Sequence, residues 1–182
     1  MPLDKIYYYV YLNDKNILYK LIKLNSNITL KDIKNNSDLL YNWHNISYNP
    51  NLTIQFIKDN PNLPWVWKGV SQNKNITLKY ILDNPDIPWV WWSVSYNSNI
   101  TLKDIKDNPD LPWDWFHVSW NLNLTIQFVK DNPNKPWGWS WISWNLHLTL
   151  KDILDNPDIP WNWWIVSYNP NITIQFVKDN LD

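Results

Sequence analysis

The sequence predicts an all-α solenoid built from 24-residue repeats, each a pair of short helices. The first observation is a row of threonines spaced 24 residues apart: Thr29, Thr53, Thr77, Thr101, Thr125, Thr149 and Thr173. The second is that one phrase surrounds every threonine, most fully over residues 97–120. The third is an Asn-Pro pair that follows most of these threonines and limits the length of any helix. A period of roughly 20–50 residues is typical of stacked repeats, whose neighbours supply one another's core.

The repeats account for most of the chain. Residues 25–182 hold six full repeats and a terminal half-repeat, Asn169–Asp182, so we expect a single solenoid domain. Residues 1–24 do not fit the phrase and are interpreted as an N-terminal cap. Two apolar segments of the cap, residues 6–12 and 17–24, flank a polar turn, and this pattern favours a β-hairpin.

The first helix of each repeat, helix A, is predicted to begin at the threonine. We number each repeat so that Asn97 is position 1 and Trp120 is position 24, which puts threonine, a good N-cap residue, at position 5. Positions 4 and 9 are always aliphatic, as a hydrophobic staple across that cap requires. Asp32, Asp104 and Asp152 occupy the third helical position, where a carboxylate favours the positive end of the helix. Helix A should end near the asparagine at position 12, because proline follows it in five copies.

The second helix, helix B, is predicted over roughly positions 15–23, as an α-helix or in part a 3₁₀-helix. The aspartate or asparagine at position 14 is expected to cap it, with the proline at position 16 tolerated in the first turn. Positions 15, 19 and 22 form one apolar stripe on a helical wheel, and position 19 is tryptophan in all six copies. We interpret this tryptophan as core, and expect Trp115→Ala to cost ~3–5 kcal/mol if the side chain is buried.

Rows of polar residues along the array are interpreted as structural. The asparagines at positions 1 and 12 are expected to cap turns and to bridge adjacent repeats through their side-chain amides. Asp86, Asp110 and Asp158 at position 14 could form a cation ladder, but Asn62 and Asn134 interrupt it, and helix capping is the simpler interpretation.

Little in the composition indicates catalysis. The chain has no Cys and only two Gly, and its histidines, His44, His117 and His147, fall at three different repeat positions. We therefore expect no enzyme activity, no cofactor and no metal site. No run approaches the length of a membrane span, and the N-terminus lacks the features of a signal peptide, so we expect neither membrane insertion nor secretion.

The candidate binding residues are the large side chains at positions that vary between repeats. Positions 17 and 19 hardly change and are interpreted as scaffold, whereas positions 18, 20 and 21 vary freely. Large apolar residues at variable positions predict a contact surface, with simple local packing as the alternative. The predicted partner-binding residues are Lys68, Trp92, Phe116, His117, Trp141 and Trp164, flanked by Trp120 and Trp144.

Three functions follow from this pattern. The first is a non-catalytic protein-binding module that presents a row of aromatic side chains. The second is a structural, self-associating protein, since the open ends of a solenoid can stack. The third is a single-stranded nucleic-acid binder, which needs a positive groove and is disfavoured by 16 Lys balanced against 17 Asp.

The repeated phrase resembles that of tryptophan-repeat proteins from giant, mimivirus-like viruses of amoebae. The matching text is Asn-Pro-Asp-Ile-Pro-Trp-x-Trp, followed by Val-Ser-Tyr-Asn-Pro-Asn-Ile-Thr at Val166–Thr173. This resemblance implies a viral protein, located in the host cytoplasm or in the virion. More distantly, the second motif is similar to the leucine-rich repeat variant family, in which an α-helix alternates with a 3₁₀-helix. The chain departs from that family by placing tryptophan where the family has small or charged residues.

Overall fold

The computed structural model describes residues 43–145, 149–169 and 173–179. The predicted N-terminal cap over residues 1–24, with its β-hairpin, lies outside the described residues, as does helix A of the first repeat. Those predictions stay predictions. The chain divides into two compact units, one up to Val90 (unit 1) and one from Trp91 onward (unit 2).

All regular elements in the described residues are short helices, so the predicted all-α repeat fold is confirmed. Unit 1 contains α4 (Trp43–Ser47), α5 (Ile54–Asp59), α6 (Trp67–Ser71) and α7 (Leu78–Asp83). Unit 2 contains α8 (Trp91–Ser95), α9 (Leu102–Asp107), α10 (Trp115–Val118), α11 (Ile126–Asp131), α12 (Trp139–Trp144), α13 (Leu150–Leu154), α14 (Trp163–Val166) and α15 (Ile174–Asp179).

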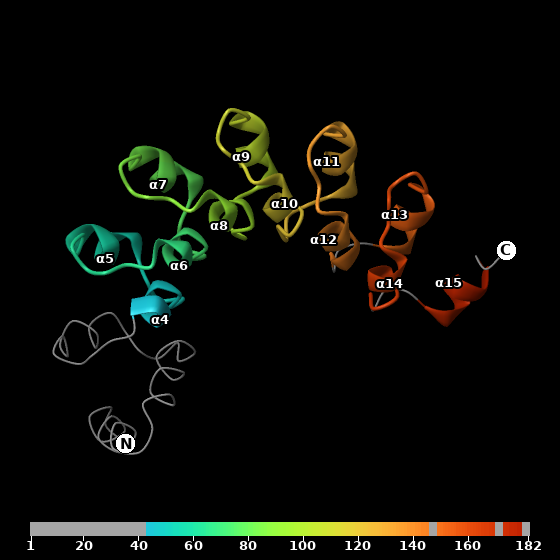
Figure 1. Ribbon diagram of the computed structural model, residues 1–182, viewed down its shortest axis with the longest axis horizontal. Coiled ribbons are helices and arrows are strands. Elements are labelled where there is room, and N and C mark those ends of the chain that lie inside the picture. Colours follow the sequence, from blue (N-terminus) through green and yellow to red (C-terminus); the bar gives the residue numbers. More distant parts are fainter. Residues whose placement is uncertain (1–42, 146–148, 170–172, 180–182) are drawn as a thin grey trace, which may run out of the picture. The chain divides into compact units, whose positions relative to one another are not determined.

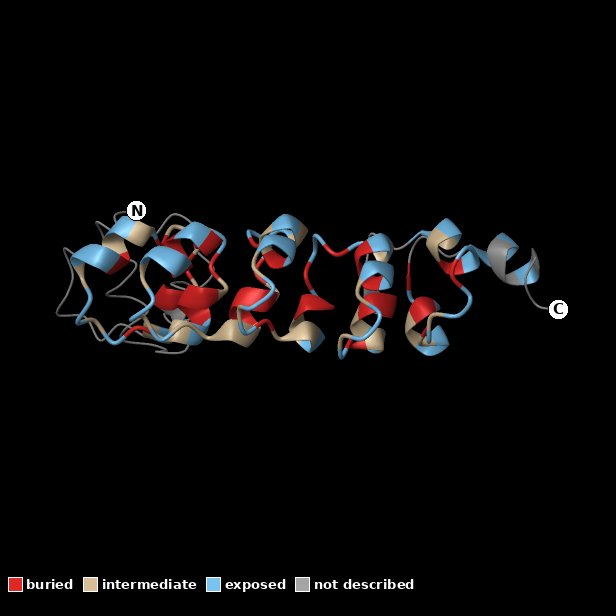
Figure 2. Ribbon diagram, turned by 90° about the horizontal axis from the view of Figure 1, so that it is seen from above, coloured by how far each residue is buried: buried red, intermediate tan, exposed pale blue. Residues whose placement is uncertain are grey.

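Within each unit the two kinds of helix form two layers. In unit 2, α9, α11 and α13 are A helices and lie side by side, while the B helices α8, α10, α12 and α14 form the second layer (Figure 1). The B helices of adjacent repeats contact each other directly, α4 with α6, α8 with α10 and α12 with α14. Buried residues lie in the middle of each stack, with exposed residues on the outer surfaces (Figure 2). Each unit is therefore a solenoid of stacked helix pairs.

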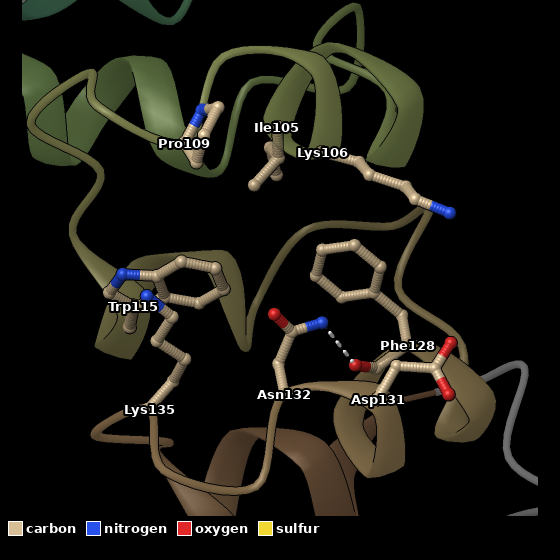
Figure 3. Close-up of a pocket in the computed structure, with 8 residues that line it drawn as sticks. All are labelled: Ile105, Lys106, Pro109, Trp115, Phe128, Asp131, Asn132 and Lys135. Atoms are coloured by element: carbon tan, nitrogen blue, oxygen red, sulfur yellow. Dashed lines mark hydrogen bonds between the residues drawn. The ribbon is translucent and has the colours of Figure 1, made fainter.

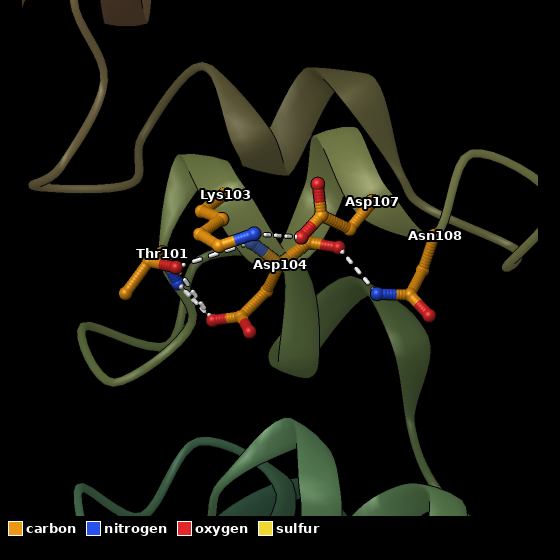
Figure 4. Close-up of polar contacts among 5 residues, drawn as sticks. All are labelled: Thr101, Lys103, Asp104, Asp107 and Asn108. Carbon is orange, nitrogen blue, oxygen red and sulfur yellow. Dashed lines mark hydrogen bonds and ion pairs between the residues drawn. The ribbon is translucent and has the colours of Figure 1, made fainter.

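Helix A begins as predicted, at the threonine. Thr53, Thr77, Thr101, Thr125 and Thr149 are N-caps whose side chains accept a hydrogen bond from the backbone N–H three residues later. A full capping box forms at Thr101 and Asp104, as Figure 4 shows, and a second forms at Thr149 and Asp152. On the outer face of α9, Lys103 pairs with Asp107. These side-chain caps compensate for a sequence without Ala, Arg or Glu, three of the best helix formers.

The hydrophobic staple is also confirmed by burial on both sides of the cap. Ile100 at position 4 and Ile105 at position 9 are both buried, as are the corresponding residues of the neighbouring repeats, Leu52 and Ile57, Ile76 and Ile81, and Leu124 and Val129.

Helix A ends where predicted, with the position 12 asparagine as C-cap in α5, α7, α9 and α11. The Nδ2 of that asparagine donates to the carbonyl four residues earlier, for example from Asn108 to Asp104 (2.9 Å).

The predicted start of helix B is wrong. Helix B begins at position 19 rather than 15, and its N-cap is position 18, for example Asp114 in α10 and Asn162 in α14. Positions 12–17 instead form tight turns, in which the N–H of Trp113 donates to the carbonyl of Leu111 (2.7 Å). The physical reason is the proline at position 16, which disfavours the α conformation at position 15 before it. The residues at position 14 therefore do not cap helix B.

The position 17 tryptophans, here called the inner tryptophans, form the core. They are Trp65, Trp89, Trp113, Trp137 and Trp161, and all except the half-buried Trp89 are buried. Each donates its indole N–H to the backbone carbonyl of the position 12 asparagine of its own repeat, at 2.8–3.0 Å. The inner tryptophan thus ties the end of helix A to the start of helix B.

The position 19 tryptophans, here called the outer tryptophans, are not buried core, and this corrects the sequence interpretation. Trp43, Trp67, Trp91, Trp115 and Trp139 are half-buried, and Trp163 is 59% exposed. The ring of an outer tryptophan packs edge-on against the inner tryptophan of the next repeat, as in Trp91 with Trp113 (5.3 Å) and Trp115 with Trp137 (5.2 Å). The reason is that helix B begins at this residue, which leaves its ring at the edge of the stack.

Two polar ladders join one repeat to the next. At position 1, the buried Asn121 donates to the carbonyls of Ser95, Asn97 and Ile100, while its Oδ1 accepts the N–H of Asn123. Bridging by this asparagine is confirmed, whereas the position 12 asparagines bond within their own repeat. The second ladder was not predicted.

The unpredicted ladder is made by the buried serines at position 23. Ser119 Oγ accepts the N–H of Gly138 in the next repeat (2.8 Å) and donates to the carbonyl of Trp115 (2.9 Å). Ser47 and Ser95 repeat both bonds, and the bond accepted by the serine satisfies a backbone N–H at the start of the next helix B.

Candidate functional site

The structure places the eight predicted binding residues in three groups. Lys68 lies in unit 1, exposed on α6. Five others belong to consecutive B-helix segments of unit 2 and lie together: Trp92, Phe116, His117, Trp120 and Trp141. Trp144 and Trp164 lie further along the same layer, at the end of α12 and in α14.

The central group forms a chain of ring contacts. Trp92 stacks on Tyr96 (6.1 Å between ring centroids) and lies 5.1 Å from His117. Tyr96 in turn lies 6.0 Å from His117 and 5.7 Å from Trp120. Trp120 then stacks closely on Trp141, at 4.3 Å with planes 15° apart. We call Trp92, Tyr96, His117, Trp120 and Trp141 the aromatic row.

The row arises because position 24 of one repeat lies against position 21 of the next. Tyr96 meets His117 in this way, and Trp120 meets Trp141. The same rule holds in unit 1, where Tyr48 covers Gly69 so closely that a Cβ atom on Gly69 would lie 2.6 Å from the tyrosine ring. In these three pairs the residue at position 21 lies against the ring at position 24 of the preceding repeat. The sequence analysis did not predict this pairing, and therefore did not include Tyr48 and Tyr96.

The exposed fractions separate the row into packed and open members. Trp92, His117 and Trp141 are half-buried between neighbouring repeats, so they contribute to local packing. Trp120 is 46% exposed, and Phe116, which contacts both His117 and Trp141, is 50% exposed. Within this group, Trp92, His117 and Trp141 thus contribute to packing between repeats, whereas Trp120 and Phe116 form an exposed surface.

Two rings of the row, those of His117 and Tyr96, carry titratable groups. Asp114 caps α10 by accepting the backbone N–H of His117 (3.0 Å), and the same carboxylate oxygen lies 3.0 Å from His117 Nδ1. Burial raises the pKa of the Tyr96 hydroxyl above its usual value. Tyr96 therefore stays uncharged throughout the physiological pH range.

Trp144 and Trp164 form a smaller, more open cluster. Trp144 is 48% exposed and lines a hollow of about 20 Å³ with Ile165 and Tyr168, which is too small for more than a single water-sized group. Trp164 is 70% exposed and contacts the ring of Tyr168 at 5.1 Å. These side chains can supply contact area to a partner but form no enclosed site.

Residues 43–145, 149–169 and 173–179 contain no group of three or more His, Cys, Asp or Glu side chains that could hold a metal ion. No helix within these residues is long and apolar enough to cross a membrane. Comparison of the chain with protein families, curated proteins and solved structures finds no match.

Proposed function

We propose that the chain is a non-catalytic protein-binding module that presents aromatic side chains from the B helices of unit 2. The observation that supports this most directly is the aromatic row, whose rings are fixed by mutual contact while Trp120 and the adjoining Phe116 remain about half exposed. Trp144 and Trp164 extend the exposed aromatic surface along the same layer.

Aromatic side chains held in this way suit protein recognition. Tryptophan and tyrosine contribute disproportionately to binding energy at protein interfaces, because they bury a large area with few rotatable bonds. Rings that are already fixed lose little conformational entropy when a partner covers them. Exposed large apolar side chains gathered on one surface are typical of interaction sites.

The proposal extends to the origin of the chain, and this part rests on the sequence phrase alone. We propose that the chain is a tryptophan-repeat protein of a giant virus, acting in the host cytoplasm or in the virion. The partner is then a host or viral protein.

Self-association is the second candidate, and Trp163 favours it. Trp43, Trp67, Trp91 and Trp115 each pack against the inner tryptophan of the next repeat. Trp163 is instead 59% exposed, and so is Tyr168 of the same repeat. An exposed copy of a side chain that elsewhere packs between repeats offers apolar area to a second chain. Nucleic-acid binding has no comparable observation in its favour, since 16 Lys are balanced by 17 Asp.

The test compares a variant of the B-helix surface with a control variant on the A helices. One carries Phe116→Ser, Trp120→Ser and Trp144→Ser on the B helices, and the control carries Leu82→Ser and Leu154→Ser, which are 46% and 51% exposed on A helices. Peptides selected from a random display library against the wild-type chain would be titrated against all three proteins. We expect the B-helix variant to lose at least about tenfold in affinity, and the control to bind as the wild type does.

Equal loss in both variants, or loss only in the A-helix control, would contradict the proposal. Circular dichroism and the midpoint of thermal unfolding establish that each variant is folded. Light scattering over a range of protein concentrations, with Trp163→Ser as the variant, separates self-association from binding to another protein.

A further inference from the structure

A second, larger hollow lies in unit 2, where residues of the two neighbouring A helices α9 and α11 line it together with the outer tryptophan Trp115. It has a volume of about 310 Å³, at the lower end of the range for pockets that hold small ligands. Ile105 and Pro109 form one wall, and Trp115 and Phe128 stand opposite, as Figure 3 shows. The Trp115 and Phe128 rings are nearly parallel, with centroids 6.4 Å apart.

A lysine at position 15 distinguishes this pocket from the equivalent place in other repeats. Position 15 is Leu or Ile in the other five copies, but here it is Lys135. Position 8 is aromatic here, Phe128, as it is at Phe56, Tyr80 and Phe176, whereas it is aspartate in Asp32, Asp104 and Asp152. Phe128 and Lys135 occur together in this repeat alone. The scaffold does not require a cation at position 15, so its presence calls for a different explanation.

The cation at this position is held in place without a carboxylate. Lys135 is half-buried, and its Nζ lies 4.6 Å from the centre of the Trp115 ring. Neither Lys135 nor Lys106, which also lines the pocket, takes part in an ion pair with any residue that the structure describes. The one carboxylate at the rim, Asp131, accepts a hydrogen bond from Gln127 (2.7 Å). The pocket is therefore aromatic and carries net positive charge.

A free acceptor completes the set of polar groups. Asn132 uses its Nδ2 to donate to the carbonyl of Phe128 (2.9 Å), and its side chain stands in the middle of the pocket (Figure 3). Its Oδ1 is thereby directed away from that carbonyl and can accept a hydrogen bond from an N–H group of a ligand.

We propose that this pocket binds an aromatic carboxylate. The ring of the ligand lies against Trp115 and Phe128, and its carboxylate is paired with Lys135. Two sources share this chemistry: a free aromatic acid, and the C-terminal residue of a peptide that ends in an aromatic side chain. A peptide adds an N–H group that Asn132 Oδ1 can accept. This site is separate from the aromatic row and does not depend on the function proposed above.

The test uses 3-phenylpropionate, its uncharged amide, and N-acetyl-Ala-Phe with a free C-terminal carboxylate. A titration at low salt is monitored by the NMR signals of the indole N–H groups. It should show that 3-phenylpropionate binds with a Kd of about 1 mM or below. The amide should bind at least about fivefold more weakly, because it lacks the charge that pairs with Lys135. Tighter binding of the peptide than of the free acid assigns the site to a peptide terminus, and equal binding assigns it to a free acid.

Lys135→Leu restores the residue type found at Leu63 and Leu111, so this variant should fold and lose the preference for the acid over the amide. Phe128→Asp, which copies Asp104 and Asp152, gives a second foldable variant and should abolish binding of the ring. Lys130→Leu, on the same helix but outside the pocket, is the matched control and should bind as the wild type does. Equal binding of acid and amide, unchanged affinity in Lys135→Leu, or no binding at 10 mM probe, a concentration about tenfold above the expected Kd, would overturn the proposal.

Discussion

The inner and outer tryptophans stand two residues apart in every repeat, yet the structure uses them differently. The inner row is largely buried, and each of its indoles is hydrogen-bonded within its own repeat. The outer row is half-buried and packs edge-on across the boundary to the next repeat. Inner tryptophans thus stabilise the fold of a single repeat, and outer tryptophans stabilise the stacking of two repeats. Solenoid stability is the sum of these two kinds of contribution.

The largest effect is expected from removing an inner tryptophan. Trp113 is 7% exposed and donates to the carbonyl of Asn108 (2.8 Å), which also accepts the N–H of Leu111, so Trp113→Ala leaves a cavity and removes one of the two hydrogen bonds to that carbonyl. We expect a loss of ~3–5 kcal/mol in the free energy of unfolding, measured by urea denaturation. The comparison of the two rows fails if Trp113→Ala proves no more destabilising than the same change at Trp115.

The asparagine ladder should come next, because it joins repeats through buried groups. Asn121→Ala removes donors to three backbone carbonyls and an acceptor for the Asn123 N–H. The carbonyls of Asn97 and Ile100 keep a second donor, whereas the Ser95 carbonyl and the Asn123 N–H lose the partner supplied by Asn121. The loss should be about 2–3 kcal/mol in urea denaturation. Asn134→Ala, at an exposed position, is the control and should be nearly neutral. If water can replace the hydrogen bonds of Asn121, the two variants will have the same free energy of unfolding, and that result would contradict the prediction.

An outer tryptophan should matter less, and only where a following repeat covers it. Trp115→Ala removes a half-buried ring that packs on Trp137 and Phe128, and should cost about 1–2 kcal/mol. Trp163→Ala removes a ring that is 59% exposed and should leave the unfolding midpoint within error of the wild type. Equal effects at the two positions would show that the outer row does not act through the next repeat.

Much of the fold could be predicted from the sequence because its signals are local. The threonine caps, the aliphatic staple and the Asn-Pro stop each depend on residues within one helix, and all three are confirmed. The predicted start of helix B is wrong because a capping residue at position 14 does not by itself start a helix. The proline at position 16 disfavours the α conformation at position 15, so helix B begins only after it. The same error placed the position 19 tryptophans in the buried core.

The candidate site was harder to predict because its contacts cross between repeats. Sequence variation identified Trp92, His117 and Trp141 as unusual, and the structure brings them together. Variation alone could not show that position 24 pairs with position 21, since these residues are 21 apart and meet only when repeats stack. Tyr96 was missed for this reason. The matched pair of Tyr48 and Gly69, one large and one small, is the signal that could have revealed the pairing.

Removing a helix cap should have the smallest effect on stability, and it shows whether the caps of helix A support the inner tryptophans. Thr101→Ala removes the cap of α9, including its bonds with Asp104, and should cost about 1 kcal/mol. Asn108 is the C-cap of α9, and its backbone carbonyl accepts the indole N–H of Trp113. A less stable α9 should therefore increase the rate of hydrogen exchange at that indole. Thr101→Ser keeps the hydroxyl and is the matched control. Faster exchange at Trp115 with none at Trp113 would show that the cap acts on the boundary between repeats rather than on the repeat itself.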